Sequence, residues 1–337
     1  MKDGNATSSV ALATVGVTVG KFNPPHLGHL HLIRCAAGRV DHLYVLLGDR
    51  TGQSIGAYRR ARWLDIDSPG NVTVLVTPDD LPEANEPWAK RALDVLPQAP
   101  DVAFTSEPWG PGWAEAMGAT HVSVDLARDS HPITATALRQ DLRANFEWLA
   151  PAARVDLVHR VVLAGAESTG KTTLAEALAR HFQTTWVPEY GRQYWHGRAH
   201  LADQRWQTEE FRHIARTHHD MADELARRAS GGLLILDTDA LVTNVWHHRY
   251  CGATDADVAE MATRHRPDLY LVAAPDFDWV QDGTRESQDE REEMHRLTLE
   301  MVSNSGSAYE VVGGAHEERL DAAIAAIESS VRYPVFT

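Results

Sequence analysis

The stretch GAESTGKT at residues 165–172 fits the phosphate-loop pattern G-x-x-x-x-G-K-[ST] with no position missing. The run RVVLAG comes directly before it, and the helical pattern TLAEALARHF follows it. Glycines let such a loop turn its N–H groups inward around phosphates. The pattern therefore predicts a strand, a tight loop and a helix start that together hold a nucleoside triphosphate. A chance glycine-rich turn is the alternative, and the flanking strand and helix disfavour it.

The chemistry of such a loop gives a role to its polar residues. Lys171 supplies positive charge to the β- and γ-phosphates of ATP, and the Thr172 hydroxyl reaches a magnesium ion. The other residues that we expect to contact ATP here are Gly165, Ser168, Thr169, Gly170 and Thr173.

Carboxylates are also expected near the metal, at the end of another strand. The segment GGLLILDTDAL places Asp237 and Asp239 directly after an apolar run. We assign Asp237 to the magnesium ion and keep Asp239 as a candidate catalytic base. A helix cap is the alternative role for an aspartate at a strand end.

Two further segments carry charged side chains suited to phosphoryl transfer. VPEYGRQYW follows the phosphate-loop helix, and the end of its strand should lie in the ligand crevice of a doubly wound sheet. Glu189 is our first choice to accept a proton from a substrate hydroxyl, and Arg192 to orient a hydroxyl or phosphate; a surface ion pair is the equal alternative. WVQDGTRESQDER offers Arg285 and Arg291, either of which a closing segment would bring to the γ-phosphate.

The stretch GKFNPPHLGH at residues 20–29 predicts a second phosphate site. It lies between the β-branched run TVGVTV and a helical pattern, so His26 and His29 are expected at a helix N-terminus, where anions bind. The histidines would then stabilise charge that develops in a transition state. Metal ligation is the alternative, but no third ligand with matching spacing is evident. The other residues of this turn that we expect to contact ATP are Gly20, Lys21, Phe22 and Gly28.

A later stretch, HPITATALRQDL, also suits a triphosphate. Thr134 and Thr136 precede a helix start and Arg139 falls one turn inside it. A threonine cap is the ordinary explanation. An arginine beside a hydroxyl-rich helix start also binds phosphate well.

Short apolar runs alternate with helical patterns twice along the chain. This alternation predicts an α/β protein with two doubly wound parallel sheets, each covered by helices on both faces. We expect a loose tail at residues 1–12, a Rossmann-like domain at 13–153 and a phosphate-loop domain at 154–337. APAARVDL, at residues 150–157, contains a proline and shows no clear period, so we interpret it as the connection between the two domains.

Composition limits the remaining possibilities. The net charge of −15 argues against a sequence-independent nucleic-acid surface, which needs a basic face. Two cysteines provide no disulfide framework and suit a reducing cytoplasm. The N-terminus does not resemble a signal peptide, and no apolar run approaches about 18 residues, so we expect no membrane span. Homo-oligomers are common and remain open.

The stretches GKFNPPHLGH and ITATALR resemble the G-x-F-x-P-x-H-x-G-H and I-S-x-T-x-x-R signatures of the nucleotidyltransferase superfamily, with Thr134 in place of serine. A phosphate-loop kinase directly after such a domain resembles the bifunctional NadR-type family, in which a nicotinamide mononucleotide (NMN) adenylyltransferase is fused to a ribosylnicotinamide kinase. The resemblance covers nearly the whole chain. It also rests on FTSEP at 104–108, EYGRQYW, LDTDALVT and WVQDGTR.

This resemblance implies two consecutive reactions. The second domain would transfer the γ-phosphate of ATP to the 5′-hydroxyl of nicotinamide riboside. The first domain would join the resulting NMN to AMP, giving NAD and pyrophosphate without a covalent enzyme intermediate. His26, His29 and Arg139 would stabilise the charged transition state of that second step.

Three points stay open. Aromatic faces bind a pyridinium ring well; Trp88 is our candidate in the first domain, and Trp195 and Trp246 are the alternatives in the kinase domain. A kinase for another nucleoside, or an NAD or ATP sensor with one vestigial domain, would show similar motifs. Some NadR-type proteins carry an N-terminal helix-turn-helix repressor; the first strand is expected near Val15, so we expect none here and no DNA binding.

Overall fold

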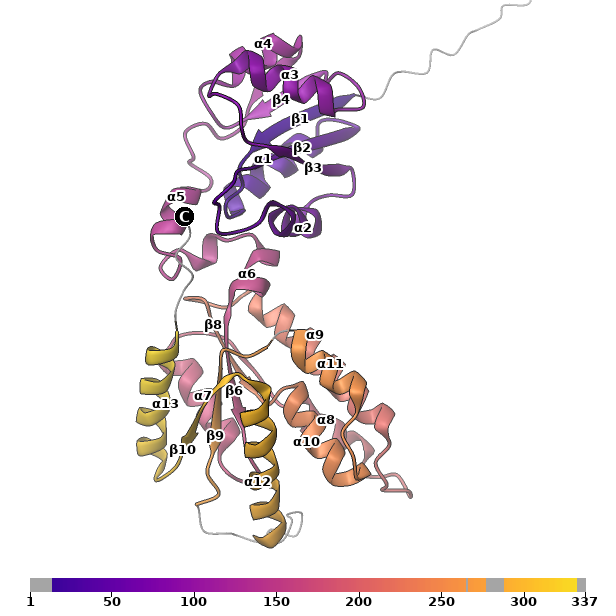
Figure 1. The fold of residues 1–337 in the computed structure, drawn as a ribbon, viewed down its shortest axis with the longest axis vertical. Coiled ribbons are helices and arrows are strands. Elements are labelled where there is room, and N and C mark those ends of the chain that lie inside the picture. The colour runs from indigo at the N-terminus through magenta and orange to yellow at the C-terminus, as the bar shows by residue number, and fades with distance from the viewer. Residues whose placement is uncertain (1–13, 265, 277–287, 332–337) are drawn as a thin grey trace, which may run out of the picture. The chain divides into compact units, whose positions relative to one another are not determined.

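A computed structural model describes residues 14–264, 266–276 and 288–331 of the chain. They form two compact units (Figure 1). Among the described residues, the first contains 14–141 together with Trp148–Ala153, and the second contains Leu142–Glu147 and the described residues from Arg154 to Val331. That residues 13–153 and 154–337 fold independently stays a prediction.

The first unit is a parallel sheet with helices between its strands. Its strands are β1 (Val15–Gly20), β2 (His42–Asp49), β3 (Val72–Pro78), β4 (Val102–Thr105) and β5 (Thr120–Ser123). Its helices are α1 (Leu27–Ala37), α2 (Ala57–Asp67), α3 (Asn85–Val95), α4 (Gly110–Met117) and α5 (Ala135–Gln140). The strand order is β3-β2-β1-β4-β5, so the order reverses at β1. In such sheets ligands bind outside the carboxyl ends of the strands at that point.

The second unit repeats this plan with another set of strands. They are β6 (His159–Ala164), β7 (Trp186–Val187), β8 (Leu233–Asp237), β9 (Leu269–Ala273) and β10 (Ala308–Val312), in the order β10-β9-β6-β8-β7 and all parallel. The helices are α7 (Lys171–His181), α8 (Tyr190–Arg198), α9 (Thr208–Ala226), α10 (Ala240–Cys251), α11 (Ala256–Arg264), α12 (Gln288–Ser305) and α13 (His316–Ser330). The central strand β6 leads directly into the phosphate loop.

Apolar side chains on both faces of this second sheet explain its layers. On one face, Val161 and Leu163 of β6 pack with Leu174 and Leu178 of α7 and Ile327 of α13. Helices α9 and α11 lie on the opposite side of the sheet from α13 (Figure 1). Because β6 is covered on both faces, its run HRVVLA is buried at every position, as expected for a central parallel strand.

The fold class predicted from the sequence is confirmed, and the structure adds three local details. The connection at Pro151–Leu157 forms the helix α6, because proline is well suited to the first position of a helix. The strand expected at the start of VPEYGRQYW is only the two residues of β7. The edge strand β10 was not predicted at all; four of its five residues are exposed, so it lacks the apolar run of a buried strand.

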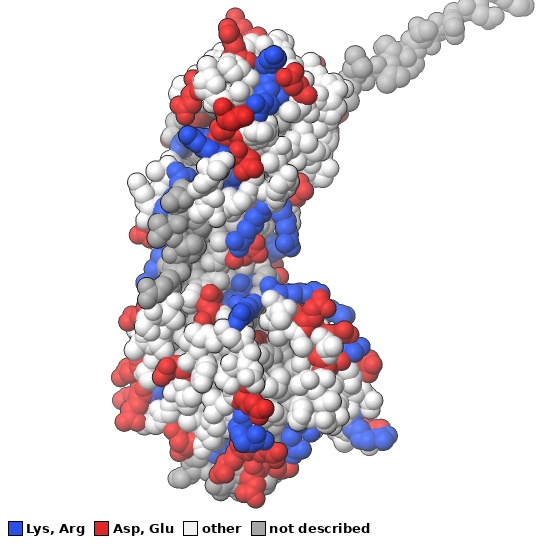
Figure 2. Space-filling model, viewed as in Figure 1, with Lys and Arg blue, Asp and Glu red and all other residues white. Residues whose placement is uncertain are grey.

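Charges on one face of the molecule are mixed rather than segregated (Figure 2). On the face drawn in Figure 2, lysines and arginines alternate with aspartates and glutamates. No helix within the described part of the chain is long and apolar enough to cross a membrane.

Candidate active sites

The turn after β1 brings two histidine rings together at the start of α1. His26 is the N-cap of this helix, and its Nδ1 accepts a hydrogen bond from the backbone N–H of His29 at 3.3 Å. The Nδ1 of His29 accepts in return from the backbone N–H of His26 at the same distance. The two rings stack with their centroids 3.5 Å apart. The histidines predicted at a helix N-terminus therefore form a reciprocal cap.

This cap fixes the tautomer of both rings. A neutral imidazole whose Nδ1 accepts a hydrogen bond carries its proton on Nε2. Burial, followed by the positive charge of Arg128, lowers the pKa of His26 to about 3. Burial also holds the pKa of His29 well below its usual range, with smaller contributions from His26 and Arg128. At neutral pH the pair thus offers two neutral Nε2–H donors.

Arg139 joins the second motif to the first. Its guanidinium donates to the backbone carbonyl of Asn23 at 2.7 Å and to the Thr136 hydroxyl at 3.1 Å. Thr134 caps α5 by accepting from the N–H of Ala137 at 3.0 Å. Two motifs more than 100 residues apart in the sequence therefore share one site.

Close packing explains why the turn has glycines at positions 20 and 28. It also shows that His131, which the sequence did not indicate, is a neighbour of the turn. A Cβ at Gly28 would lie 3.2 Å from the His26 ring and 3.6 Å from the Cβ of His131. A Cβ at Gly20 would lie 3.1 Å from the ring of Phe22. Lys21 is half-exposed and pairs with Asp79 at 3.7 Å. His131 precedes the ITATALR motif, and a single histidine there carries no recognisable pattern.

The phosphate loop has the backbone that its sequence predicts. Gly165, Ser168 and Gly170 all have positive φ angles, of 129°, 55° and 79°. Such angles turn successive N–H groups toward a common concave side. The ammonium group of Lys171 donates to the carbonyl of Ala166 at 2.7 Å, and Thr169 donates to the same carbonyl at 2.9 Å. Lys171 therefore lies against its own loop, where a phosphate can replace the carbonyl as its partner.

Asp237 and Thr172 form a pair suited to a hard cation. The Thr172 hydroxyl donates to Oδ2 of Asp237 at 2.6 Å. The other oxygen, Oδ1, is buried and has no hydrogen-bond partner among the described residues. Burial raises the pKa of Asp237, opposed by Lys171 and Thr172. Oxygen ligands of this kind fit Mg²⁺, which is usually held by one or two protein oxygens together with substrate phosphates and water. No cluster of three or more histidine, cysteine or acidic residues suited to a metal occurs within residues 14–264, 266–276 and 288–331.

The two candidate bases have different surroundings. Glu189 is the N-cap residue of α8, and its carboxylate lies 3.5 Å from the guanidinium of Arg192, whose side chain is 63% exposed. Asp239 is buried: one oxygen caps α10 through the N–H of Val242 at 2.9 Å, and the other accepts from the Tyr270 hydroxyl at 2.6 Å. This gives Asp239 a structural role and favours Glu189 as the base.

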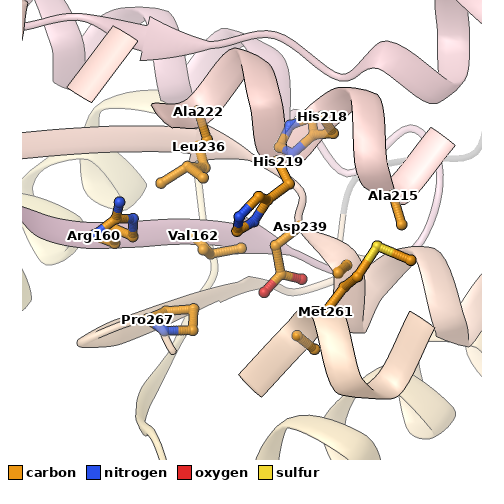
Figure 3. A pocket seen from close by; sticks show the side chains of 12 residues that line it. Arg160, Val162, Ala215, His218, His219, Ala222, Leu236, Asp239, Met261 and Pro267 are labelled. Carbon is orange, nitrogen blue, oxygen red and sulfur yellow. The ribbon is translucent and has the colours of Figure 1, made fainter. Parts of the chain in front are cut away.

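A small cavity lies beside Asp239 and does not suit a substrate. Its volume is about 30 Å³, room for a water molecule or two. Figure 3 shows Arg160, His218 and Asp239 around it, together with apolar side chains such as Val162 and Met261. Burial lowers the pKa of His218 to about 4. A larger, open cavity of about 390 Å³ runs along α8 and is lined by Tyr190, Gln193, Tyr194, Gly197, Arg198 and Leu201.

The three candidate tryptophans lie in different environments. Trp88 packs against the apolar core of the first unit. Trp195 is 38% exposed on α8. Trp246 packs in a cluster with Ala166 of the phosphate loop, and its ring stacks on Tyr250 with centroids 5.8 Å apart. Arg285 and the segment WVQDGTR lie outside the described residues, and Arg291 is buried on α12.

Comparison with known proteins identifies relatives of both units. A family model described as an AAA domain matches residues 160–319, and a model described as cytidylyltransferase-like matches residues 17–53. The trifunctional NAD biosynthesis/regulator protein NadR of Escherichia coli (strain K12) is 28% identical over 316 residues, which cover 87% of this chain and 77% of that protein. The chain is a homologue of NadR.

Other relatives agree with this assignment. The NadR of Salmonella typhimurium is 26% identical, over 86% of this chain and 77% of its own length. Two crystal structures of a NadR protein, one in complex with NR and one with NAD and AMP-PNP, superpose on the NadR homologue with TM-scores of 0.69 and 0.67. They are 21% and 22% identical to it and cover 95% and 96% of the chain, and 97% and 98% of their own. At these identities they establish the fold. A nicotinamide-nucleotide adenylyltransferase of Aeropyrum pernix matches over 32 residues at 53% identity, 10% of this chain and 19% of that protein.

Proposed function

We propose that this NadR homologue is a bifunctional, ATP-dependent enzyme of NAD biosynthesis. The observation that carries the proposal is the presence of two complete phosphate-binding turns, one at the carboxyl end of the central strand of each sheet. Each turn has its own polar side chains, so each unit can bind its own ATP. One relative is named as an NAD biosynthesis/regulator protein and another as a nicotinamide-nucleotide adenylyltransferase, which supports a role in NAD biosynthesis.

In the kinase reaction, the second unit phosphorylates nicotinamide riboside. The loop N–H groups and Lys171 bind the β- and γ-phosphates, and Thr172 and Asp237 would hold Mg²⁺, which neutralises phosphate charge. Glu189 accepts the proton of the 5′-hydroxyl as that oxygen attacks the γ-phosphorus, and Arg192 orients the hydroxyl or the transferred phosphate. The products are NMN and ADP. The binding of NR to a related NadR protein supports this choice of substrate.

In the adenylyltransferase reaction, the first unit converts NMN into NAD. A phosphate oxygen of NMN attacks the α-phosphorus of a second ATP, and pyrophosphate leaves. The Nε2–H groups of His26 and His29 donate to the phosphate oxygens, and Arg139 neutralises the charge that develops on them. Arg139 is held in place by Asn23 and Thr136, so it needs no rearrangement to act. The complex of a related NadR protein with NAD and AMP-PNP supports this product and cosubstrate.

The experiment that tests the proposal is a single incubation with ATP, Mg²⁺ and nicotinamide riboside, with products identified by mass spectrometry. We expect NMN to form first and NAD to follow. Formation of a nucleotide only from uridine or thymidine would instead indicate a kinase for another nucleoside. Binding of ATP or NAD without turnover would indicate a sensor.

Three properties accompany the proposal: location, state of assembly and class of ligand. We place the enzyme in the cytoplasm, which supplies ATP and keeps Cys35 and Cys251 reduced. The state of assembly, monomer or homo-oligomer, is open to measurement by light scattering. We expect small molecules rather than nucleic acid as its ligands, because the chain is acidic.

A further inference from the structure

A buried arginine contacts the phosphate-binding turn in each unit. In the first unit it is Arg60, which has no exposed surface, and in the second it is Arg319, which is 2% exposed. Each is the fourth residue of its helix, Arg60 in α2 and Arg319 in α13. Side chains of a helix point back toward its N-terminus, so both guanidinium groups reach past the start of the helix.

Each guanidinium group donates to three backbone carbonyls, and these carbonyls occupy equivalent places in the two units. The Nε donates to the carbonyl five residues earlier, that of Ile55 for Arg60 and Gly314 for Arg319, at 3.0 Å in both cases. One terminal nitrogen donates to the carbonyl of a phosphate-binding turn. That carbonyl belongs to Lys21 for Arg60, and to Thr169, at 2.9 Å, for Arg319.

The other terminal nitrogen reaches the carboxyl end of the neighbouring strand. Arg60 donates to Gly48, near the end of β2, at 3.3 Å. Arg319 donates to Ala274, directly after β9, at 2.9 Å. Because β1 pairs with β2 and β6 pairs with β9, each arginine ties a phosphate-binding turn to the strand beside it. The rigid fork of a guanidinium suits such a fixed set of acceptors.

The two arginines differ in how their charge is balanced. Every acceptor of Arg60 named above is a neutral carbonyl, and the side-chain oxygen of Gln53, also neutral, accepts at 2.6 Å, while the carboxylates of Asp49 and Asp79 favour its positive charge through space. Arg319 has an anionic partner in addition, since it pairs with Asp276, whose second oxygen accepts from the N–H of Gly314 at 2.6 Å. Both positive charges nevertheless lie beside the backbone of a turn that has to bind phosphates.

We propose that Arg60 and Arg319 are positioning residues that set the affinity for ATP, each for its own reaction. They touch no reacting atom. Each arginine holds a backbone carbonyl of its turn in place. The N–H groups and side chains of the turn that face the phosphates therefore need no reorganisation when ATP binds. The proposal rests on the assignment of two ATP-dependent reactions to the two units. It goes beyond that assignment in adding two residues that no sequence motif marks.

The test compares the KM for ATP of both reactions in the full chain. Arg60→Met should raise the KM for ATP in the conversion of NMN to NAD by about tenfold or more, since small displacements of a binding group cost up to about 10²-fold. The KM for ATP in riboside phosphorylation should not change. Arg319→Met should have the opposite pattern. In both variants the KM for the nicotinamide substrate should stay near that of the parent chain.

Arg160 provides the matched control. It is also a buried arginine of the second unit, 5% exposed, but it lies at the amino end of β6 and donates to Val155 at 2.8 Å. Arg160→Met should lower the thermal stability without changing either KM for ATP. A merely structural role for Arg319 predicts that Arg319→Met behaves like Arg160→Met, and that result would overturn the proposal.

Chemical rescue by guanidinium distinguishes the loss of the arginine's contacts from a general folding defect. Arg60→Ala and Arg319→Ala leave spaces that a guanidinium ion fits, and millimolar guanidinium should lower the raised KM for ATP of the affected reaction only. Rescue of both reactions, or of neither in a folded variant, would contradict the proposal. If the parent chain lacks one of the two activities, the proposed function fails for that unit. If the parent has both and the variants keep a normal KM for ATP, the positioning role alone fails.

Discussion

The two phosphate-binding turns of this molecule solve one problem with different chemistry. In the first unit, neutral imidazole N–H groups and Arg139 would face the phosphates, and the turn is built around prolines and a histidine cap. In the second unit, backbone N–H groups and Lys171 would do so, and the turn depends on positive φ angles. The difference indicates which part of ATP each turn handles: side chains suit charge developing at the α-phosphate, and a ring of N–H groups with a lysine suits the β- and γ-phosphates.

The largest expected effect comes from removing the lysine. Lys171→Ala should lower riboside phosphorylation by roughly 10²- to 10³-fold, the usual cost of losing one well-placed electrostatic group. The conversion of NMN to NAD should be unaffected, because the first unit has its own turn. Steady-state assays of each reaction alone measure this. A parallel loss of both activities in the folded variant would mean that the two turns do not work separately.

Glu189→Gln sharpens the assignment of the base. Loss of a general base typically costs about 10²- to 10⁴-fold, so kinase turnover should fall by roughly 10²-fold or more while ATP binding changes little. Asp239→Asn is the matched control, and it should lower the melting temperature more than the turnover, because Asp239 caps α10 and accepts from Tyr270. The reverse pattern would move the proton transfer to Asp239.

His29→Ala tests the imidazole side of the comparison. The conversion of NMN to NAD should fall by about 10²-fold, through the loss of one donor to the transition state. Riboside phosphorylation should stay normal. His42→Ala, a change at the opposite end of the same sheet, where the His42 side chain contacts Thr73 and Tyr44, should leave both rates unchanged. Equal losses of NAD formation in both variants would contradict the catalytic role proposed for the His26–His29 pair.

The smallest effect concerns pH and stability. His26 is buried with its pKa lowered to about 3, whereas an unfolded histidine titrates near 6.5. The unfolded chain therefore binds a proton that the folded chain refuses as the pH falls below about 6.5. This contribution to stability is fully present above that pH and decreases by up to about 1.4 kcal/mol per pH unit below it, until the pH nears 3.

Denaturant titrations between pH 7.5 and 4.5 measure this slope. His26→Asn keeps a capping side chain at the helix start and cannot titrate, so it should remove the part of the slope that belongs to His26. Other buried histidines, such as His29 and His218, remain and give the variant a residual slope. An unchanged slope would mean that His26 is protonated in the folded chain.

Local patterns allowed much of the fold and of the site to be predicted. The phosphate loop and the histidine turn are short contiguous motifs whose function dictates their backbone, so they specify strand, turn and helix together. The pairing of Thr172 with Asp237 was expected because a phosphate loop needs a hydroxyl and a carboxylate near its metal ion. Edge strand β10 was not predicted, because an exposed strand needs no apolar run.

Properties that arise from packing between distant segments could not be predicted in this way. Arg60 and Arg319 look like ordinary surface residues of helical patterns, YRRARW and EERLDA, and only the folded chain shows that both are buried on backbone carbonyls. The role of Asp239 depends on Tyr270, 31 residues away, and the exposure of Glu189 depends on how α8 begins. A sequence supplies residue types, and burial decides which of them remain available for chemistry.

The central claim is that two chemistries occupy two separate ATP sites, and mixing two crippled variants tests it most directly. His29→Ala alone, given ATP, Mg²⁺ and nicotinamide riboside, should accumulate NMN. Lys171→Ala alone should leave the riboside unchanged yet convert added NMN to NAD. A mixture of the two should make NAD from the riboside, because NMN released by one variant is the substrate of the other. If the mixture makes no NAD, although each variant is folded and the parent chain does, the two-site account is contradicted.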